Sequence, residues 1–149
     1  MFGLPRKKDE TGSYASSSTG LVQDAVRIAK DTNPDILVIT DLCLCGYISH
    51  GHCGILDGEN VDNDKTLDTY REIALSQASA GSDIIAPSGM MDGQVGIIRK
   101  ALDTNGYTDT AVMGYSAKYA SSFYGPFRDA SDSSPSFGDR KSYQIDPAN

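Results

Sequence analysis

The chain has 149 residues, of which 39% are hydrophobic and 22% charged, and this balance predicts one soluble globular domain over 1–149. A formal net charge of −7 argues against a nucleic-acid partner, because phosphate binding needs a clustered basic surface. No run approaches the ~18 consecutive apolar residues of a membrane span, and the start becomes charged before any signal-like apolar stretch, so we expect a cytoplasmic protein without a membrane partner.

The first elements are predicted to be a loop, a helix and a strand. Residues 1–19 are polar and rich in Gly and Ser, which is typical of a loop. Apolar residues then recur at helical spacing over 21–33, with Ser18 or Thr19 as the candidate N-cap. The continuous, partly β-branched apolar run 36–40 indicates a strand buried on both faces, as in a parallel sheet.

A second helix and a second strand follow. Asp62 or Asp64 can cap a helix whose apolar residues share one face, and Gly81 would supply its C-terminal turn. Residues 83–86 are then predicted to form a strand, which Pro87 closes.

The last helix and strand are predicted over 92–106 and 110–118. Strands that alternate with helices at this spacing imply parallel pairing through right-handed crossovers, so the expected fold class is α/β. The segment 119–149 shows no periodicity, and loops of this length in compact domains are usually functional lids or disorder.

All three cysteines, Cys43, Cys45 and Cys53, lie in one stretch after the first predicted strand. Such close thiolates can surround a soft divalent metal and leave a fourth tetrahedral position for water or substrate, as in a catalytic zinc site. The alternative is that they are ordinary buried cysteines, which are often inert. The odd number favours a reducing compartment. His50 and His52 are interpreted as hydrogen-bonding neighbours of the ligands.

Residues with catalytic potential gather where the predicted strands end. Asp41, Cys43 and Cys45 follow the first strand, Ser88 follows the second, and Lys118 closes the third. In parallel α/β folds, and in (β/α)8 barrels especially, active sites are built at this edge of the sheet. The sequence therefore predicts an active site there.

For individual residues the sequence leaves alternatives open. Lys118 follows an apolar strand beside aromatic residues, where desolvation would lower the pKa of its amine, as a Schiff-base nucleophile requires. The alternative is a solvated charge at a strand end. Arg128 and Arg140 could clamp a carboxylate, although isolated arginines in loops are usually surface residues.

Three long motifs, in order, resemble the porphobilinogen synthase family, also called 5-aminolevulinate dehydratase. Residues 41–54 resemble its metal loop, 84–93 its second signature, and 115–129 its lysine and lid segment. Shorter matches at 2–5 and 137–144 extend the similarity over nearly the whole chain. The chain is less than half as long as a usual family member and resembles its middle part.

The resemblance implies a (β/α)8 barrel, a fold that needs about 250 residues. We therefore expect an incomplete barrel of about three βα units, with a loop over 1–19, the βα units over 20–118 and an active-site lid over 119–149. The implied enzyme, a hydro-lyase, condenses two molecules of 5-aminolevulinate to porphobilinogen with loss of two waters, in haem and tetrapyrrole biosynthesis. The full-length family suggests a homo-octamer, and allosteric Mg²⁺ is a further cofactor to consider.

The same resemblance implies roles for the residues at the strand ends. The three cysteines would bind Zn²⁺, which would act as a Lewis acid on one substrate and on bound water. Lys118 would be one of two Schiff-base lysines, turning a ketone into a more electrophilic iminium. Asp41 and Ser88 would line the pocket as proton-transfer and hydrogen-bonding groups. In the lid, a substrate carboxylate would be held by Arg128, Arg140 and Gln144, beneath walls formed by Phe123 and Phe127.

The chain departs from the family pattern at several positions. Gly89 stands where an acid is usual and Gln94 where an arginine is usual, while Gly46 and Ile48 occupy variable positions of the metal loop. The resemblance implies that the second Schiff-base lysine lies downstream of Asn149 and that the N-terminal assembly arm lies outside these residues. We therefore expect these 149 residues to be inactive alone, with two unpaired sheet edges.

Two other readings compete with an enzyme of this family. A non-catalytic fragment of the same fold could use the cysteine loop only to bind zinc or to associate with other subunits. A lysine-dependent barrel aldolase is disfavoured, because Schiff-base aldolases need no metal and would not need the cysteine trio.

Overall fold

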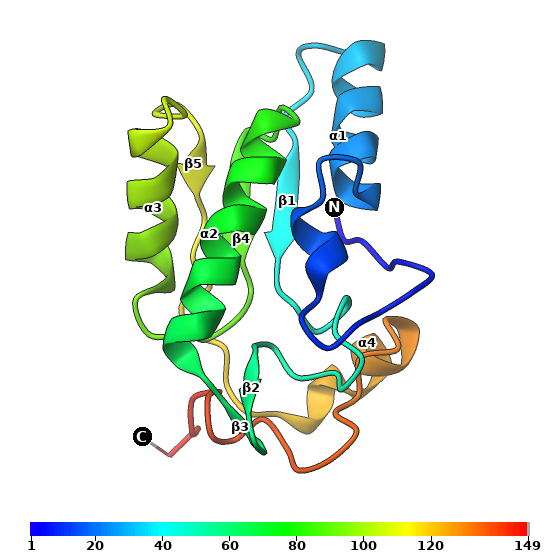
Figure 1. Cartoon of the computed structure of the whole chain (residues 1–149), viewed down its shortest axis with the longest axis vertical. Helices are drawn as coiled ribbons and strands as arrows, with labels where there is room; N and C mark the ends of the chain where they lie inside the picture. Colours follow the sequence, from blue (N-terminus) through cyan, green and yellow to red (C-terminus); the bar gives the residue numbers. More distant parts are fainter. Residues whose placement is uncertain (149) are drawn as a thin grey trace.

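A parallel three-stranded sheet is the centre of the computed structural model, which describes residues 1–148 (Figure 1). Its strands are β1 (Ile39–Leu42), β4 (Ile84–Pro87) and β5 (Ala111–Val112), in the spatial order β1-β4-β5. The long helices are α1 (Leu21–Thr32), α2 (Asn63–Ser79) and α3 (Gln94–Thr104). In Figure 1 α2 lies over β4, with α1 and α3 on either side of it. The predicted alternation and parallel α/β class are confirmed.

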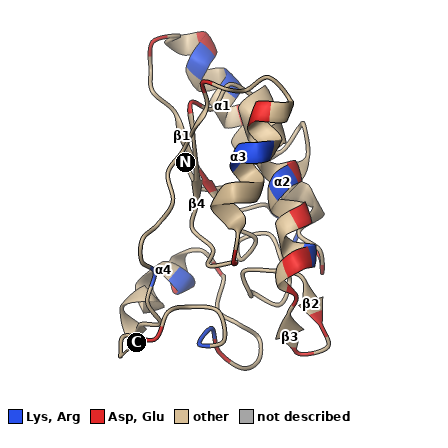
Figure 2. Cartoon of the chain, turned by 90° about the vertical axis from the view of Figure 1, so that its left-hand side faces the viewer, with Lys and Arg blue, Asp and Glu red and all other residues tan. Residues whose placement is uncertain are grey.

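The sheet has one covered and one open side. Figure 2 shows α2 and α3 on the same side of β1 and β4, with charged residues mainly along the helices. Within β1 the burial alternates: Thr40 and Leu42 are fully buried, whereas Ile39 and Asp41 are half-buried. The prediction of burial on both faces is therefore wrong for this strand, because the second face opens toward the candidate site.

Helix α2 follows its sequence signals closely. The Asp62 side chain accepts a hydrogen bond from the Lys65 backbone N–H at 3.0 Å, which makes Asp62, rather than Asp64, the N-cap. Tyr70 and Ile73 are buried on the face turned to the core. After the C-cap, Gly81 has φ +105°, so the predicted C-terminal turn is confirmed.

The start of α1 differs from the prediction. The N-cap is Gly20, and neither Ser18 nor Thr19 caps the helix. The chain has already turned in a 3-10 helix, η1 (Ser13–Ser16), inside the predicted loop, and the Ser17 hydroxyl then accepts from the Thr19 N–H at 3.3 Å. The local hydroxyl groups therefore stabilise the preceding turn instead of the helix.

The first and third strands have other bounds than predicted. β1 begins at Ile39 rather than at residue 36, because the Val38 carbonyl already accepts from the backbone of residues 83 and 84 and the ladder starts beyond it. Ile36 and Leu37 are 43% and 64% exposed. β5 ends at Val112 rather than near residue 118, since β4 offers it only two paired positions.

The remaining elements lie around the end of the sheet where β1 and β4 finish. A hairpin of β2 (Leu56–Asp57) and β3 (Asn60–Val61) was not predicted; it turns at Gly58, whose φ is +63°. The segment after β5 contains η2 (Ser122–Tyr124) and α4 (Gly125–Ala130), and a bridge between Tyr119 and Ile145 closes it on itself. It is thus folded in this structure rather than disordered.

The main apolar core joins α2 and α3 to the sheet, while α1 packs in a second, smaller cluster. The fully buried members of the main core come from both layers and from the cysteine loop: Leu42, Leu44, Ile48, Tyr70, Ile73, Ala74, Ile85, Ile98 and Leu102. The loop after β1 is therefore packed into the core, which fixes its path. Across residues 1–148 we find no helix that is long and apolar enough to span a membrane.

Candidate active site

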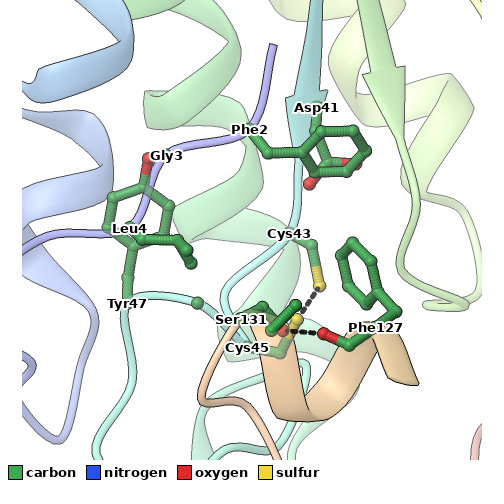
Figure 3. Close-up of a pocket in the computed structure, with 11 residues that line it drawn as sticks. Phe2, Gly3, Leu4, Asp41, Cys43, Cys45, Tyr47, Phe127 and Ser131 are labelled. Atoms are coloured by element: carbon green, nitrogen blue, oxygen red, sulfur yellow. Dashed lines mark hydrogen bonds between the residues drawn. The ribbon is translucent and has the colours of Figure 1, made fainter. Parts of the chain in front are cut away.

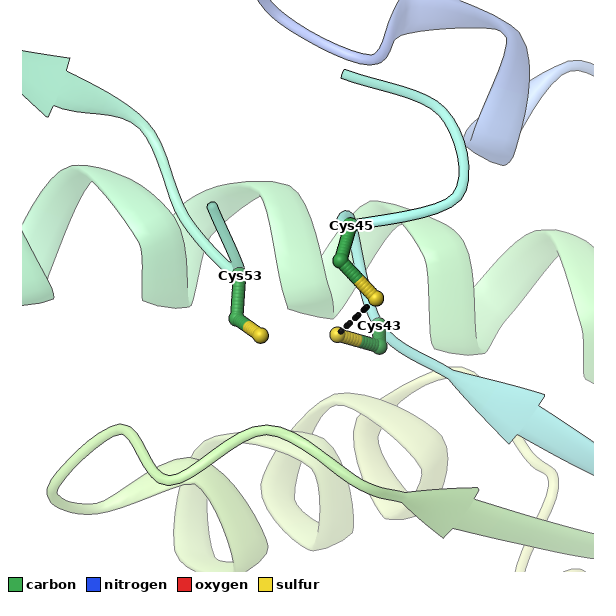
Figure 4. Close-up of side chains that lie close together, drawn as sticks. All are labelled: Cys43, Cys45 and Cys53. Carbon is green, nitrogen blue, oxygen red and sulfur yellow. Dashed lines mark hydrogen bonds between the residues drawn. The ribbon is translucent and has the colours of Figure 1, made fainter. Parts of the chain in front are cut away.

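The three cysteines form a compact, buried group at the carboxyl end of β1 (Figure 4). Their sulfur atoms all lie within 4.8 Å of one another, and those of Cys43 and Cys45 are 3.5 Å apart. All three are free thiols with at most 8% exposure. Thiolates at this spacing are soft ligands that suit a tetrahedral ion such as Zn²⁺.

The cysteines reach this point by two routes. Cys43 directly follows β1, and Cys45 lies in a turn in which Leu44 accepts from the backbone N–H groups of Tyr47 and Ile48 at 2.8 and 2.9 Å. Cys53 arrives from a separate stretch of the loop, as Figure 4 shows. The sheet therefore fixes the first two thiols, and the far end of the loop brings in the third.

The pKa of one thiol is lowered and those of the other two are raised. Hydrogen bonds from Cys45 and Cys53 hold the pKa of Cys43 well below its ordinary value. The shared hydrogen bonds with Cys43 raise the pKa of the other two thiols. The group is therefore prepared to present a thiolate to a cation.

Asp41 lies beside the cysteines, and its carboxyl group has a raised pKa. Burial, followed by the nearby Cys43, raises its pKa to about 7, whereas Ser88 and Lys118 act in the opposite direction. Its Oδ1 atom is buried and has no hydrogen-bond partner among residues 1–148. Such a carboxyl group can exchange a proton near neutral pH.

Lys118 lies in the same region, but its pKa is shifted in the direction opposite to the predicted one. Its Nζ donates to the Ser88 carbonyl at 2.6 Å and sits 5.5 Å from the centre of the Tyr124 ring. Burial lowers its pKa, but Cys43 and the other anionic groups around it outweigh burial and raise it. The predicted lowering is therefore wrong, because three thiols and Asp41 surround the amine.

A small cavity connects the acid to two of the cysteines. It has a volume of about 170 Å³, and Figure 3 shows Asp41, Cys43 and Cys45 on its wall together with the rings of Phe2 and Phe127. These two rings meet edge to face, with their centres 5.6 Å apart. The segment after β5 and the start of the chain thus meet beside the cysteine group.

A second cavity, of about 290 Å³, is lined by the three residues of segment 119–149 that were expected to hold a carboxylate, Arg128, Arg140 and Gln144. The Nε atoms of both arginines and both polar side-chain atoms of Gln144 are buried, and the described part of the chain offers them no hydrogen-bond partner. Unpaired buried donors of this kind are the groups that an anionic ligand would satisfy. Phe123, by contrast, is 93% exposed and lies away from this cavity's wall.

Sequence reasoning missed two tyrosines that touch Cys53. The Tyr70 hydroxyl donates to the Cys53 carbonyl at 2.8 Å, and the Tyr143 hydroxyl accepts from the Cys53 N–H at 3.4 Å. From the sequence, Tyr70 is only one of the residues on the apolar face of the second predicted helix. Tyr143 adjoins Gln144 in a motif that was noted, but nothing local in sequence links it to residue 53.

The two histidines of the loop lie outside the group of sulfur atoms. His52 is hydrogen-bonded to Tyr143 and to the Phe137 carbonyl, and His50 accepts from the His52 backbone N–H at 3.2 Å through Nδ1. His52 is thus linked to Cys53 through Tyr143, in keeping with the hydrogen-bonding role interpreted from sequence, whereas His50 bonds to the backbone of His52.

Comparison with known proteins gives one consistent family. The family model described as "Delta-aminolevulinic acid dehydratase" matches residues 1–149. A delta-aminolevulinic acid dehydratase of Halalkalibacterium halodurans is 56% identical over 149 residues, covering 100% of this chain and 45% of that protein. One of Staphylococcus epidermidis is 57% identical over 151 residues, covering 100% of this chain and 47% of its own length. The chain thus spans about half the length of the curated relatives it matches.

A solved structure agrees with this assignment. The crystal structure of delta-aminolevulinic acid dehydratase (porphobilinogen synthase) from Toxoplasma gondii ME49, in complex with the reaction product porphobilinogen, superposes with a TM-score of 0.92 at 44% identity. The match covers 95% of this chain and 41% of that one. The parallel strands and their helices are accordingly an incomplete (β/α)8 barrel. By sequence and by fold, the chain belongs to the delta-aminolevulinic acid dehydratase family.

Proposed function

We propose that this chain carries part of the active site of a porphobilinogen synthase, which condenses two molecules of 5-aminolevulinate to porphobilinogen in tetrapyrrole biosynthesis. The observation that carries the proposal is the buried cysteine group with Asp41 and Lys118 beside it. Since the chain spans about half of its relatives, the complete activity belongs to a longer protein. We propose that these residues alone form no porphobilinogen.

The metal that this group would hold is Zn²⁺, with Cys43, Cys45 and Cys53 as ligands. Three sulfur donors within 4.8 Å fit a tetrahedral ion with one free position. When bound, the ion supplies Lewis-acid chemistry to a substrate oxygen or to water in that position. Hard cations such as Mg²⁺ prefer oxygen ligands, so an allosteric Mg²⁺ would need a different site.

Lys118 is proposed as the Schiff-base lysine. Its Nζ would attack the ketone carbon of 5-aminolevulinate, forming a carbon–nitrogen bond, and the ketone oxygen would leave as water. The amine must first lose a proton, because anionic neighbours keep it charged. Asp41, with a pKa of about 7, is a suitable acceptor for that proton, and Ser88 holds the amine in place through its carbonyl.

The segment 119–149 is proposed as an active-site lid. Arg128, Arg140 and Gln144 would bind the substrate carboxylate through their buried N–H groups, which have no partner in residues 1–148. Phe127 already forms a wall over the cysteine group. Phe123 would join it only after a movement of the lid, since its ring is 93% exposed here. Closure would exclude water from the reaction.

The wider setting follows from the same assignment. We propose that 1–149 forms a single partial barrel domain, that the protein is cytoplasmic, and that the longer protein assembles as a homo-octamer. The substrate is a small amino-ketone acid, and no nucleic acid or membrane is needed as a partner.

Imine trapping tests the catalytic assignment. The chain is incubated with 5-aminolevulinate and borohydride, digested, and examined by mass spectrometry. We expect Lys118 to gain the mass of one 5-aminolevulinate less one oxygen atom, because the carbonyl oxygen leaves as water and the imine is reduced. The variant Lys118→Met should show no adduct, whereas Lys100→Met, which removes an exposed amine from α3, should keep it.

Metal content measured on the same samples separates the two competing readings. Zinc bound at Cys43, Cys45 and Cys53 together with an adduct at Lys118 supports the enzyme. Zinc without any adduct supports a non-catalytic zinc-binding fragment and refutes the role of Lys118. Porphobilinogen formed by the isolated chain would contradict the requirement for the rest of the barrel.

A further inference from the structure

We propose that Cys53 is held by a tyrosine clamp, formed by Tyr70, Tyr143 and His52, which couples metal binding to docking of the lid. The proposal rests on the metal site proposed above and adds a regulatory link between that site and the lid. It assigns a positioning role to residues that touch neither the metal nor the substrate.

Two residues of the clamp, Tyr70 and Tyr143, hydrogen-bond to the backbone of Cys53, one at its carbonyl and the other at its N–H group. Tyr70, fully buried in α2, donates its hydroxyl proton to the Cys53 carbonyl at 2.8 Å. Tyr143, in the lid, accepts from the Cys53 N–H at 3.4 Å and packs against the cysteine group. One half of the clamp is therefore part of the rigid core, while the other half belongs to the segment proposed to move.

His52 fixes the hydroxyl of Tyr143 in its place. Nε2 of His52 is 3.1 Å from the Phe137 carbonyl, which can only accept, so this nitrogen carries the proton. Nδ1 is then an acceptor, and the Tyr143 hydroxyl donates to it at 3.0 Å. The oxygen of Tyr143 is left free to accept from Cys53. His52 is 3% exposed, so these roles are protected from water.

Further bonds join the lid to the same short stretch of the loop. The Ser136 N–H donates to the His50 carbonyl at 3.0 Å, and Nη2 of Arg140 donates to the Gly51 carbonyl at 2.8 Å. Gly51 has φ +74°, and a Cβ there would lie 2.4 Å from the Ser134 carbonyl oxygen. The lid backbone therefore docks on residues 50–53, the stretch that delivers the third thiol.

The consequence is a reciprocal coupling. Cys43 and Cys45 are placed by β1 and the turn after it, whereas the position of Cys53 depends partly on contacts with the lid. If the docked lid holds Cys53 ready for the metal, the bound metal must stabilise the docked lid by the same free energy. Mutation of a residue that hydrogen-bonds to a metal-ligating residue typically weakens metal affinity by about 10–100-fold.

The test uses the 149-residue chain, the variant Tyr143→Phe, and Tyr119→Phe as a matched control that removes an exposed hydroxyl from the same segment. Zinc affinity is measured by competition with a chromophoric chelator, and amide hydrogen exchange is followed over 136–145 with and without zinc. We expect Tyr143→Phe to bind zinc roughly 10-fold more weakly. Its lid should exchange faster without metal and gain less protection from zinc. Tyr119→Phe should behave as wild type.

Two further variants separate the halves of the clamp. Tyr70→Phe should weaken zinc binding while leaving lid exchange without metal unchanged, because the hydroxyl that it removes bonds to Cys53 and to no lid residue within 1–148. His52→Gln should act like Tyr143→Phe on both readouts. Circular dichroism spectra equal to wild type show that each variant is folded.

The outcomes distinguish the proposed coupling from the metal-site proposal on which it rests. Wild-type zinc affinity in Tyr143→Phe, or lid exchange in the wild type that zinc leaves unchanged, would overturn the coupling while leaving the metal site intact. Absence of zinc binding in the wild-type chain would overturn both the metal site and the coupling. Weaker binding in Tyr143→Phe, with the matching loss of lid protection, supports the clamp.

Discussion

Asp41 and Asp9 both lie beside the cysteine loop, and the pKa values of their carboxyl groups are shifted in opposite directions. Burial and Cys43 raise the pKa of Asp41 to about 7. Hydrogen bonds from Ser13, first from its side chain and then from its backbone, lower the pKa of Asp9 to about 2. The Asp9 backbone also bridges to Ile48, so Asp9 ties the start of the chain to the cysteine loop. Only the folded surroundings distinguish these two residues of the same type.

Asp9 gives a pH-dependent contribution to stability. Its pKa is lower in the folded chain than the ordinary 3.8, so its ionised form stabilises the fold above about pH 4, and this contribution is lost as the pH falls toward 2. We expect Asp9→Asn to lower the free energy of unfolding at pH 7 by less than about 1 kcal/mol, because solvent screens this exposed group. Urea unfolding of both chains across this range measures the effect.

The decisive feature of that experiment is its pH profile. The difference between wild type and Asp9→Asn should shrink as the pH falls from 4 to 2, and a difference that stays constant would contradict the assignment. Asp109→Asn, which removes an exposed charge far along the sequence, controls for the change in net charge.

At this scale the sequence predicted positions better than ionisation states. The sequence predicted that Asp41, Ser88 and Lys118 meet near the ends of successive strands, and they do, although Asp41 lies inside β1 and Lys118 lies beyond the end of β5 at Val112. The direction of the Lys118 pKa shift could not be predicted, since it depends on how closely the fold brings Cys43, and then Cys53, Cys45 and Asp41, to the amine. Tyr143 was missed for the same reason: its contact spans 90 residues of sequence.

At the scale of elements, the connection between β4 and α3 explains two departures from the family pattern. A Cβ at Gly89 would lie 2.1 Å from the Tyr70 hydroxyl, so the connection crosses α2 at a point with no room for a side chain. Gln94 stabilises this connection, because its side chain donates to the Gly89 carbonyl at 2.8 Å and accepts from the Met91 N–H at 3.1 Å. An amide supplies both a donor and an acceptor here, which an arginine could not.

The close approach of Gly89 to Tyr70 can be tested with a double-mutant cycle. Gly89→Ala should destabilise the chain by about 1–3 kcal/mol through overpacking. In the Tyr70→Phe background the same substitution should cost less, because the atom it meets has gone. The interaction free energy from urea unfolding measures this difference. Gly96→Ala in α3 is the control, since no atom lies within 4 Å of its added Cβ. Equal costs of Gly89→Ala in both backgrounds would show that the hydroxyl is not the obstacle.

Some bounds of the helices and strands are set by neighbours in sequence, and others by partners that are distant in sequence. The cap of α2 was predictable because Asp62 acts on its own neighbours in sequence. The start of β1 was not, since the strand begins where its partner β4 begins, and the apolar residues 36–38 carry no sign of that register. The β2–β3 hairpin pairs only two residues on each strand, which is too short for a periodic pattern.

At the scale of the molecule, the sheet ends in strands without a full neighbour. The Met1 amino group donates to the Ile39 carbonyl and the Met1 carbonyl accepts from the Asp41 N–H at 2.9 Å, so the first residue occupies only part of the β1 edge. Near the two edges large apolar side chains are exposed, among them Leu37 at 64% and Met113 at 43%. The α/β class was predictable from the alternation of elements, whereas the closed barrel was predictable only from resemblance.

Unpaired strand edges with exposed apolar side chains favour association between chains. We therefore expect the isolated chain to self-associate as its concentration rises, and Leu37→Lys to shift that association to higher concentration by placing a charge beside the β1 edge. Sedimentation velocity over a concentration series measures this shift. Thr104→Lys adds the same charge at an exposed polar position on α3 and should leave association close to wild type. If both variants respond alike, net charge rather than the β1 edge governs association, because only one of them alters that edge.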